Sequence, residues 1–308
     1  MTQSHSNQNK YMAIGSEKLL GHLAMLLFAA LIAGSFSIGS LTGPHIEPAA
    51  LNSIRFLVGS LVMLTVSVTI YRVAPSIPVS PWRFAILGAL MAIYFVLMFA
   101  ALQIASPVST GAVFTLIPLM SAGFGWLFLR QTTKPIVIVS LIVAALGAIW
   151  VIFRGDVEAI LRFNIGKGEA IYFIGCACHA AYTPLLRKFN RGEPTILFAL
   201  FTLIAIFLWI SLAGARDILN TDWTQLPTIV WIGVAYLGTF TTAGTFFLLQ
   251  FAAVRLPASK VMAYGYLTPS FIILIEGVIG NGWAGLAVLA GALVTALALA
   301  IIAFAPDA

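Results

Sequence analysis

Long apolar stretches separated by short polar segments dominate this chain. A helix that crosses a bilayer needs about 20 mostly apolar residues. Ten stretches reach that length: roughly 19–41, 49–71, 83–102, 107–129, 135–153, 169–187, 194–213, 228–250, 257–279 and 284–304. Turn-forming or charged residues separate them, as in Arg191-Gly192-Glu193-Pro194. The pattern predicts an all-α membrane protein with ten transmembrane helices.

Composition supports the same fold class. Hydrophobic residues make up 61% of the 308 residues and charged residues only 8%, whereas soluble domains carry about 25% charged residues. A soluble fold of this length cannot hide so much apolar surface, so we expect a lipid bilayer as partner. Residues 1–18 are polar and are expected to form an unstructured tail. The stretch after them lacks an obvious small-residue cleavage site, which favours a retained first helix.

The distribution of basic residues predicts how the chain is oriented in the membrane. The net charge is +6, but the basic residues are scattered between apolar stretches, which argues against a nucleic-acid partner. With the N-terminus inside, the inner segments hold Lys10, Lys18, Arg72, Arg83, Arg130, Lys134, Arg187, Lys188, Arg191 and Arg255. The outer segments hold only Arg154, Arg162, Lys167 and Arg216. The positive-inside rule therefore predicts a multi-pass protein of the bacterial inner membrane with both termini cytoplasmic.

Two halves of the chain resemble each other. The segment FAALQIASPVSTGAVFTLIP, from Phe99 to Pro118, is similar to FAAVRLPASKVMAYGYLTP, from Phe251 to Pro269. The predicted repeats are 19–153 and 169–304, joined by a loop at 154–168 and followed by a short tail at 305–308. Five helices is an odd number, so the second copy must be inverted in the membrane. Inverted repeats are common in transporters and place the substrate site near the midplane between the copies.

Several short motifs resemble those of a known transporter family. They are Asn52-Ser53-Ile54-Arg55-Phe56, Leu116-Ile117-Pro118 and Tyr266-Leu267-Thr268-Pro269. Together with the repeat, they resemble the EamA family of the drug/metabolite transporter superfamily. Family members often carry Gly-Glu where this chain has Arg130-Gln131 and Gly280-Asn281. The chain looks most like the aromatic amino-acid exporters of the family. That resemblance implies alternating-access export of amino acids and related metabolites through a central cavity.

The sixth predicted helix carries the strongest candidate site. Polar and aromatic residues recur there at spacings of three and four, which defines one helix face: Tyr172, Gly175, Cys176, His179, Tyr182 and Thr183. His179 lies near mid-span, where an ionisable group is a functional hypothesis by default. The alternative is a neutral histidine bonded to a neighbouring helix. The predicted cavity also includes Tyr94, Phe240 and Tyr264, with hydrogen-bonded core as the alternative for the tyrosines.

Cations within the spans are few. Lys260 is near the cytoplasmic boundary and can share a face with Tyr264 and Thr268. It is therefore a candidate for capturing a substrate carboxylate. The equal alternative is a lysine that extends its ammonium group to lipid phosphates. For Arg55 and Glu276, extension of the charged group to the membrane interface is favoured.

Pro118 and Pro269 occupy matching positions in the fourth and ninth predicted helices. Each removes a backbone hydrogen bond and bends its helix. Matching bends in an inverted repeat are candidates for hinges in alternating access. A static bend that serves packing is the alternative.

Other classes of function lack support in the sequence. No Gly-x-Ser-x-Gly, His-Glu-x-x-His or Walker motif is present. The predicted spans contain only two glutamates, one at the first position of the sixth span and one near the end of the ninth, and no aspartate, so an enzyme is not expected. Cys176 and Cys178 do not face each other on a helix, and we expect no metal, no cofactor and no obligate protein partner. The charged rings of an ion channel are not visible. The alternative function is export of other hydrophobic metabolites, drugs or lipids by a protein of the same fold.

Overall fold

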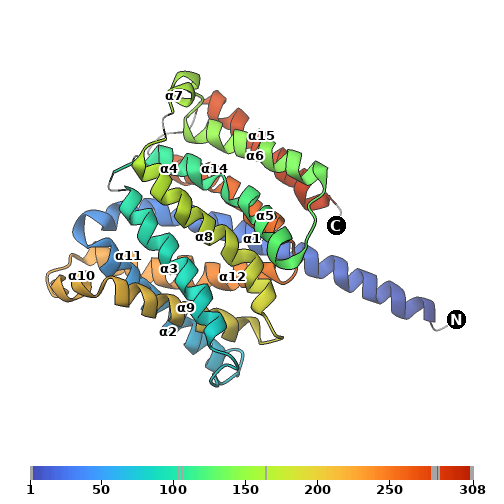
Figure 1. The fold of residues 1–308 in the computed structure, drawn as a ribbon, viewed down its shortest axis with the longest axis horizontal. Helices are drawn as coiled ribbons and strands as arrows, with labels where there is room; N and C mark the ends of the chain where they lie inside the picture. The colour runs from blue at the N-terminus through green and yellow to red at the C-terminus, as the bar shows by residue number, and fades with distance from the viewer. Residues whose placement is uncertain are drawn as a thin grey trace.

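The computed structural model describes residues 3–102, 104–105, 107–163, 165–278, 283 and 285–305, and no strand occurs within these ranges. Helices make up most of the described chain (Figure 1). In chain order the elements are α1 (Gln3–Thr42), η1 (Gly43–His45), α2 (Pro48–Thr69), α3 (Trp82–Leu102), α4 (Pro107–Phe114), α5 (Ile117–Leu129), α6 (Pro135–Ile152), α7 (Val157–Leu161), α8 (Lys167–Phe189), α9 (Thr195–Ala213), α10 (Ala215–Asn220), α11 (Thr228–Tyr236), η2 (Leu237–Gly244), α12 (Thr245–Ala253), α13 (Ala258–Ala263), η3 (Tyr264–Leu267), α14 (Thr268–Val278) and α15 (Leu286–Phe304).

Within the described ranges, 8 helical segments are long and apolar enough to cross a membrane. They match all of the predicted spans except the third and the sixth, which correspond to α3 and α8. α3 contains a shorter apolar stretch, Trp82–Met98. The membrane class of the fold is thus confirmed, while ten crossings stay a prediction that rests on α3 and α8.

The surface of the bundle is apolar along whole helix faces. α6 exposes a row of large apolar side chains, and so does α15: Ile136, Val139, Ile142, Leu146, Leu286, Leu289, Leu293 and Leu297. Exposed apolar surface on this scale needs lipid to cover it. The N-terminal part of α1 projects from the bundle instead (Figure 1). The expectation of an unstructured tail is therefore wrong for residues 3–18, which continue the first helix.

The helices pack in corresponding pairs. α3 packs on α8 and α12 on α1; α5 packs on α8 and α14 on α1. α2 pairs with α9, and α6 pairs with α15 along one edge of the bundle (Figure 1). These are the contacts that a two-fold relation between the halves requires. The inverted repeat stays a prediction, and the packing agrees with it.

Two of the spanning segments are broken at the predicted proline positions. α4 ends at Phe114 and α5 begins at Ile117, so Pro118 is the second residue of α5. In the second half, the 3-10 turn η3 precedes α14, in which Pro269 is the second residue. A proline in the first helical turn removes no intrahelical hydrogen bond. The Tyr266 hydroxyl donates to the carbonyl of Thr115 at 2.9 Å. A tyrosine at the second break therefore hydrogen-bonds a backbone carbonyl at the first break.

A buried arginine holds together the segments at one end of the bundle. Arg83, at the start of α3, has only 1% of its side chain exposed. It donates to the carbonyls of Val79 and Phe189 and pairs with Glu193, which follows α8. Partial burial acts to raise the pKa of Glu193, but hydrogen bonds from Arg83 and the Arg191 backbone outweigh it and lower that pKa. The α2–α3 and α8–α9 connections are thereby joined.

We expect Arg83→Gln to lower the free energy of unfolding by about 3 kcal/mol, because the remaining carboxylate and carbonyls lose a buried charged partner. Chemical unfolding in detergent measures the change. The Glu193 pKa is lowered on folding, so the pair stabilises fully above the unfolded-state pKa. That contribution disappears as the pH falls through the folded-state pKa, so the difference between the wild type and the variant should shrink there to the part that comes from the two carbonyls.

Arg162→Gln is the matched control. Arg162 pairs with Glu158 across one helical turn, but both side chains are more than 70% exposed, at 78% and 72%. Its removal should cost no more than about 0.5 kcal/mol. Equal losses in the two variants would contradict the structural role of Arg83.

Candidate functional site

α8 carries a row of polar side chains through the interior of the bundle. Tyr172, Cys176, His179 and Thr183 are all buried, and their spacing of three or four residues keeps them on one face. α8 packs against α3 on one side and α4 and α5 on the other. Cys176 and Cys178 are both free thiols. The polar face of α8 is therefore covered by its neighbours, while Phe173 and Ile174 lie on an exposed face of the same helix.

His179 and Tyr94 meet at the centre of this row. Their ring centroids are 4.6 Å apart, and the ring of Phe114 lies 6.3 Å from that of His179. The hydroxyls of Tyr94 and Tyr172 lie 3.3 Å apart. His179 is 6% exposed, and its Nδ1 has no hydrogen-bond partner among the described residues. Such atoms are uncommon in protein interiors, which makes Nδ1 available to a ligand group.

The other predicted site residues lie in different surroundings. Tyr182 is buried against Phe246 of α12, with ring centroids 6.2 Å apart. Tyr264 turns toward α1, where its hydroxyl and His22 Nδ1 are 2.9 Å apart. Phe240 is 52% exposed and lies against Tyr236 on the outside of the bundle. The structure therefore brings His179 and Tyr94 together but does not bring Phe240 to them.

Lys260 is buried rather than extended to the lipid surface. It is 3% exposed, and its ammonium group donates to the carbonyl of Ala305 at the C-terminal end of α15. A cation at that position also interacts favourably with the helix dipole. This contact contradicts the snorkelling alternative. Lys260 nevertheless contributes to the wall of a pocket.

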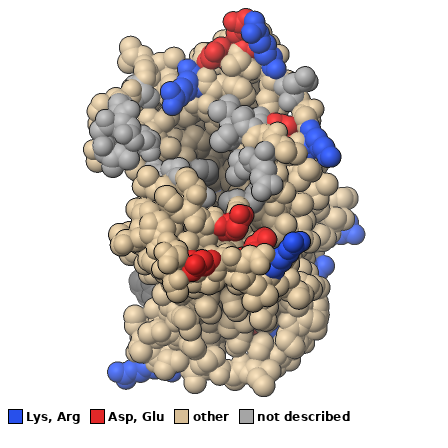
Figure 2. Space-filling model, turned by 90° about the vertical axis from the view of Figure 1, so that its left-hand side faces the viewer, with Lys and Arg blue, Asp and Glu red and all other residues tan. Residues whose placement is uncertain are grey.

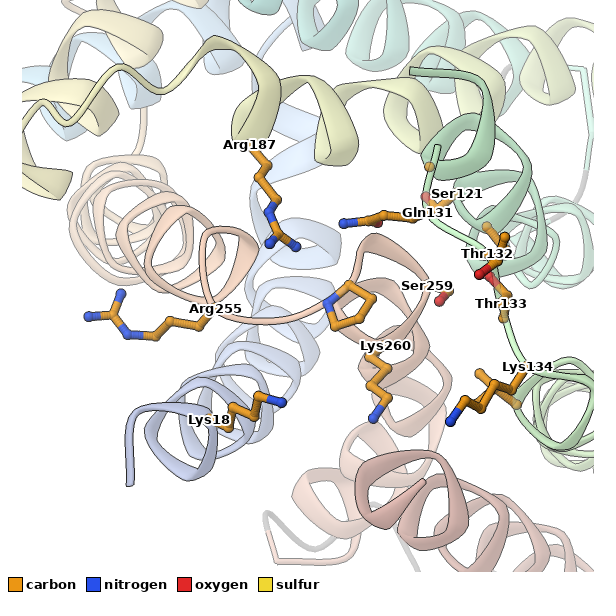
Figure 3. A pocket seen from close by; sticks show the side chains of 14 residues that line it. Lys18, Ser121, Gln131, Thr132, Thr133, Lys134, Arg187, Arg255, Ser259 and Lys260 are labelled. Carbon is orange, nitrogen blue, oxygen red and sulfur yellow. The ribbon is translucent and has the colours of Figure 1, made fainter. Parts of the chain in front are cut away.

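That pocket, here called the basic pocket, has a volume of about 300 Å³. It lies where α1, α5, α6, α8 and α13 come together at one end of the bundle (Figure 3). Its lining includes five cationic side chains and several neutral hydrogen-bonding ones: Lys18, Lys134, Arg187, Arg255, Lys260, Ser121, Gln131, Thr132, Thr133 and Ser259. Arg187 and Gln131 point toward each other across the open space (Figure 3).

The polar face of α8 connects the basic pocket with His179. Thr183 is one turn from His179 and one turn from Arg187, which lines the pocket. The Thr183 hydroxyl contacts Met262 Sδ at 3.0 Å, and both residues are buried. This contact between α8 and α13 therefore stands between the pocket and the buried histidine.

A proline inside α8 creates a second polar contact in the same region. Pro184 has no N–H, so the carbonyl of Ala180, four residues earlier, loses its helical partner. The hydroxyl of Ser121, on α5, donates to that carbonyl at 2.9 Å. Ser121 also lines the basic pocket. The position at which Pro184 interrupts the hydrogen bonding of α8 is thus tied to the helix that forms the opposite wall.

Sequence reasoning missed two of these features. Arg187 was counted only toward topology, although its spacing of eight residues from His179 places it on the same helix face. Arg55 was expected to extend to the interface. In the structure its Nε donates to Thr242 of the π-helical segment η2 at 3.0 Å, and its guanidinium lies over Phe56 and Phe95. The side chain of Glu276 and residues Gly280 and Asn281 lie outside the described part.

The described residues contain no group of three or more His, Cys, Asp or Glu side chains that could hold a metal. Apolar spanning helices, a polar helix enclosed by them and a basic pocket at one end define the class of polytopic membrane transporters. The model of the EamA-like transporter family matches residues 19–153 and again residues 166–304. The chain therefore belongs to the EamA-like transporter family, as its motifs predicted, and this family indicates a transporter rather than an enzyme.

Similarity to individual proteins agrees with this assignment. The chain is 22% identical over 265 residues to the uncharacterized transporter YyaM of Bacillus subtilis (strain 168), covering 84% of this chain and 86% of that protein. A solved crystal structure superposes with a TM-score of 0.74 and 21% sequence identity, over 93% of this chain and 97% of that chain. The superposition supports the fold.

The contact between Ser121 and Ala180 allows a test of whether the Ser121 hydroxyl replaces the helical hydrogen bond that Pro184 removes. Ser121→Ala should lower the free energy of unfolding by about 1–2 kcal/mol, because it leaves a buried carbonyl without a partner. In a Pro184→Ala background the new N–H of residue 184 can donate to that carbonyl. The cost of Ser121→Ala should then fall by about 1 kcal/mol, as measured by a double-mutant cycle of unfolding. Additive effects would show that the hydroxyl does not replace the missing helical bond.

Proposed function

We propose that this protein exports amino acids, in particular aromatic or other apolar ones, and related small metabolites from the bacterial cytoplasm across the inner membrane. The observation that carries the proposal is the connection along α8 between the basic pocket and the buried His179–Tyr94 pair. One end of this row is open to solvent and the other is enclosed in protein. A small solute can therefore be bound at the pocket and passed inward along a polar surface.

The basic pocket is proposed to face the cytoplasm. Four of its five cations belong to the set that the positive-inside rule assigns to the inner side: Lys18, Lys134, Arg187 and Arg255. Both termini lie at the same end of the bundle as these residues (Figure 1). In this orientation the protein presents its pocket to cytoplasmic solutes. The Thr183–Met262 contact is then the inner barrier that a solute must pass.

The proposed central site consists of His179, Tyr94 and Tyr172, with Phe114 beside them. Their rings offer flat faces against which an aromatic side chain can stack, and His179 Nδ1 offers one hydrogen bond. Phe240 does not belong to this site because its ring is on the exposed surface. Tyr264 and Tyr182 lie on the helices that border the site.

Alternating access with two inverted five-helix repeats is part of the proposal. Its support is the double match of the family model and the corresponding pairs of helix contacts. The breaks before Pro118 and Pro269 lie at matching places in the two halves and contact each other through Tyr266 and Thr115. A change in one half can therefore reach the other directly.

The central site can be tested by tryptophan transport in liposomes containing the purified protein. His179→Ala and Tyr94→Ala should each reduce the transport rate about fivefold to thirtyfold. The loss of a hydrogen bond between neutral groups, or of a ring contact, in a buried site costs about 1–2 kcal/mol. Phe240→Ala is the control and should transport at the wild-type rate. Wild-type rates in both site variants would refute the site. Transport of hydrophobic dyes or lipids without any transport of amino acids would favour the alternative class of substrate.

The hinge hypothesis predicts a separate kinetic effect. Pro118→Ala and Pro269→Ala allow the breaks to close into regular helix, so helices that must bend become stiffer. The double variant should bind tryptophan with an unchanged Kd but turn over several times more slowly. Binding measured by calorimetry and transport measured in liposomes separate the two quantities. An unchanged turnover would leave the prolines as static bends.

A further inference from the structure

The lining of the basic pocket is unusual for a site that receives zwitterions. Five of its fourteen lining residues are cationic, and none of the fourteen is a carboxylate. Glu17 lies outside the lining and pairs with Arg255 at 2.6 Å. The α-ammonium group of an amino acid would therefore meet like charge and neutral acceptors in the pocket, but no opposite charge. A solute with net negative charge would meet only opposite charge and neutral donors.

Arg187 is one of the cations directed into the open space, as are Lys18 and Lys134 (Figure 3). Its guanidinium reaches toward Gln131, whereas Arg255 points away from the centre of the pocket (Figure 3). Arg255 is paired with Glu17 and also donates to the carbonyl of Phe251. Arg187 forms no ion pair within the described part of the chain, and its side chain is exposed.

We infer that Arg187 binds the anionic group of the substrate at the basic pocket, and that the preferred substrates are small organic anions with a net negative charge. This inference rests on the proposed transport function and places the preferred substrates among the related small metabolites with net negative charge rather than among zwitterionic amino acids. A guanidinium can donate two parallel hydrogen bonds to a carboxylate or phosphate. The Gln131 amide, on the other side of the space, supplies a further donor.

The position of Arg187 on α8 gives this binding a direction. Bound anion at Arg187 would be two helical turns from His179, with Thr183 between them. A carboxylate that leaves water needs hydrogen-bond donors along its path, and this face of α8 supplies a hydroxyl and an imidazole. The same face that holds the anion at the pocket thus leads toward the unpartnered Nδ1 of His179.

The pocket at the opposite end of the bundle is lined by carboxylates rather than by cations. A smaller pocket of about 170 Å³ lies there between α2, α3 and α9, and its lining includes Glu47 and Asp217 but no cation. Figure 2 shows this end, where acidic side chains lie on the surface together with basic ones. Carboxylates at this pocket disfavour the binding of an anion through like-charge repulsion. An anion therefore finds its favourable site at one end only.

Three probes that share one indole ring test the inference: N-acetyltryptophan with charge −1, tryptophan with charge 0 and tryptophanamide with charge +1. Their binding to the purified protein in neutral-lipid nanodiscs is measured by calorimetry, with glutarate as an anion that lacks the ring. Binding should follow the order of negative charge. Arg187→Gln should weaken binding of N-acetyltryptophan and glutarate at least about tenfold, as expected for loss of a hydrogen bond to a charged group, and affect tryptophanamide least. Arg187→Lys should restore part of the affinity.

Lys188→Gln is the matched control, because Lys188 is the next residue on α8 but lies over the ring of Phe128 outside the pocket. It removes the same charge and should leave all four affinities unchanged. The inference is overturned if neither anion binds more tightly than tryptophanamide, or if Arg187→Gln and Lys188→Gln act alike. It is also overturned if Arg187→Gln abolishes only stabilisation by phosphatidylglycerol, because the pocket would then hold a lipid headgroup. Transport of tryptophan without anion preference would leave the proposed function standing and remove only this refinement.

Discussion

The hydrocarbon core of a bilayer offers no water to a backbone carbonyl, and much of this structure follows from that constraint. Every helix interruption inside the bundle must find its hydrogen bonds in the protein. Ser121 donates to the carbonyl that Pro184 leaves unpaired, and Tyr266 donates to a carbonyl at the break before Pro118. Each of these bonds joins two different helices. Breaks in helices are therefore also the points at which neighbouring helices are tied together.

The same constraint separates the bundle into a polar part and an apolar part. α8 can carry Tyr172, His179 and Thr183 because its neighbours cover it. α6 and α15, by contrast, are held by close apolar contact. A Cβ atom added at Gly147 would lie 2.5 Å from Thr295 Oγ1 and 3.0 Å from the carbonyl of Gly291, so these two helices approach too closely for a larger side chain. The α6–α15 pair forms an apolar edge of the bundle. α8, by contrast, carries the polar side chains of the proposed site and the internal proline, Pro184.

The sequence was sufficient for the features that depend on local pattern. Apolar length predicted most spanning segments, and helical period predicted that Tyr172, His179 and Thr183 share a face. His179, expected near mid-span, and Tyr94, predicted to line the same cavity, are both buried and lie beside each other. Position in three dimensions was harder to predict. Phe240 lies within η2, whose π-helical geometry changes the rotation per residue, so a count based on an α-helix does not give its direction. Tyr264 turns toward His22 of α1, and no local pattern identifies that partner.

Arg187 shows a different limit. Basic residues at helix ends serve topology so often that a single sequence does not distinguish one that also lines a pocket. The distinction came from Lys18, Lys134 and Arg255, which are remote in sequence and approach Arg187 only when α1, α6 and α12 are assembled around α8. A pocket made of the ends of several helices has no contiguous signature in the chain.

The opposite charges of the two pocket linings also bear on the energy that moves a solute. A cell membrane is negative inside, and each negative charge that leaves through 100 mV releases about 2.3 kcal/mol. For a monovalent anion this corresponds to an outward concentration ratio of about fiftyfold. An anion that is gathered among Lys18, Lys134 and Arg187 and discharged beside Glu47 and Asp217 would move down this electrical gradient. A carrier of such a solute needs no proton-binding carboxylate at the middle of its spans, because the membrane potential itself performs the work.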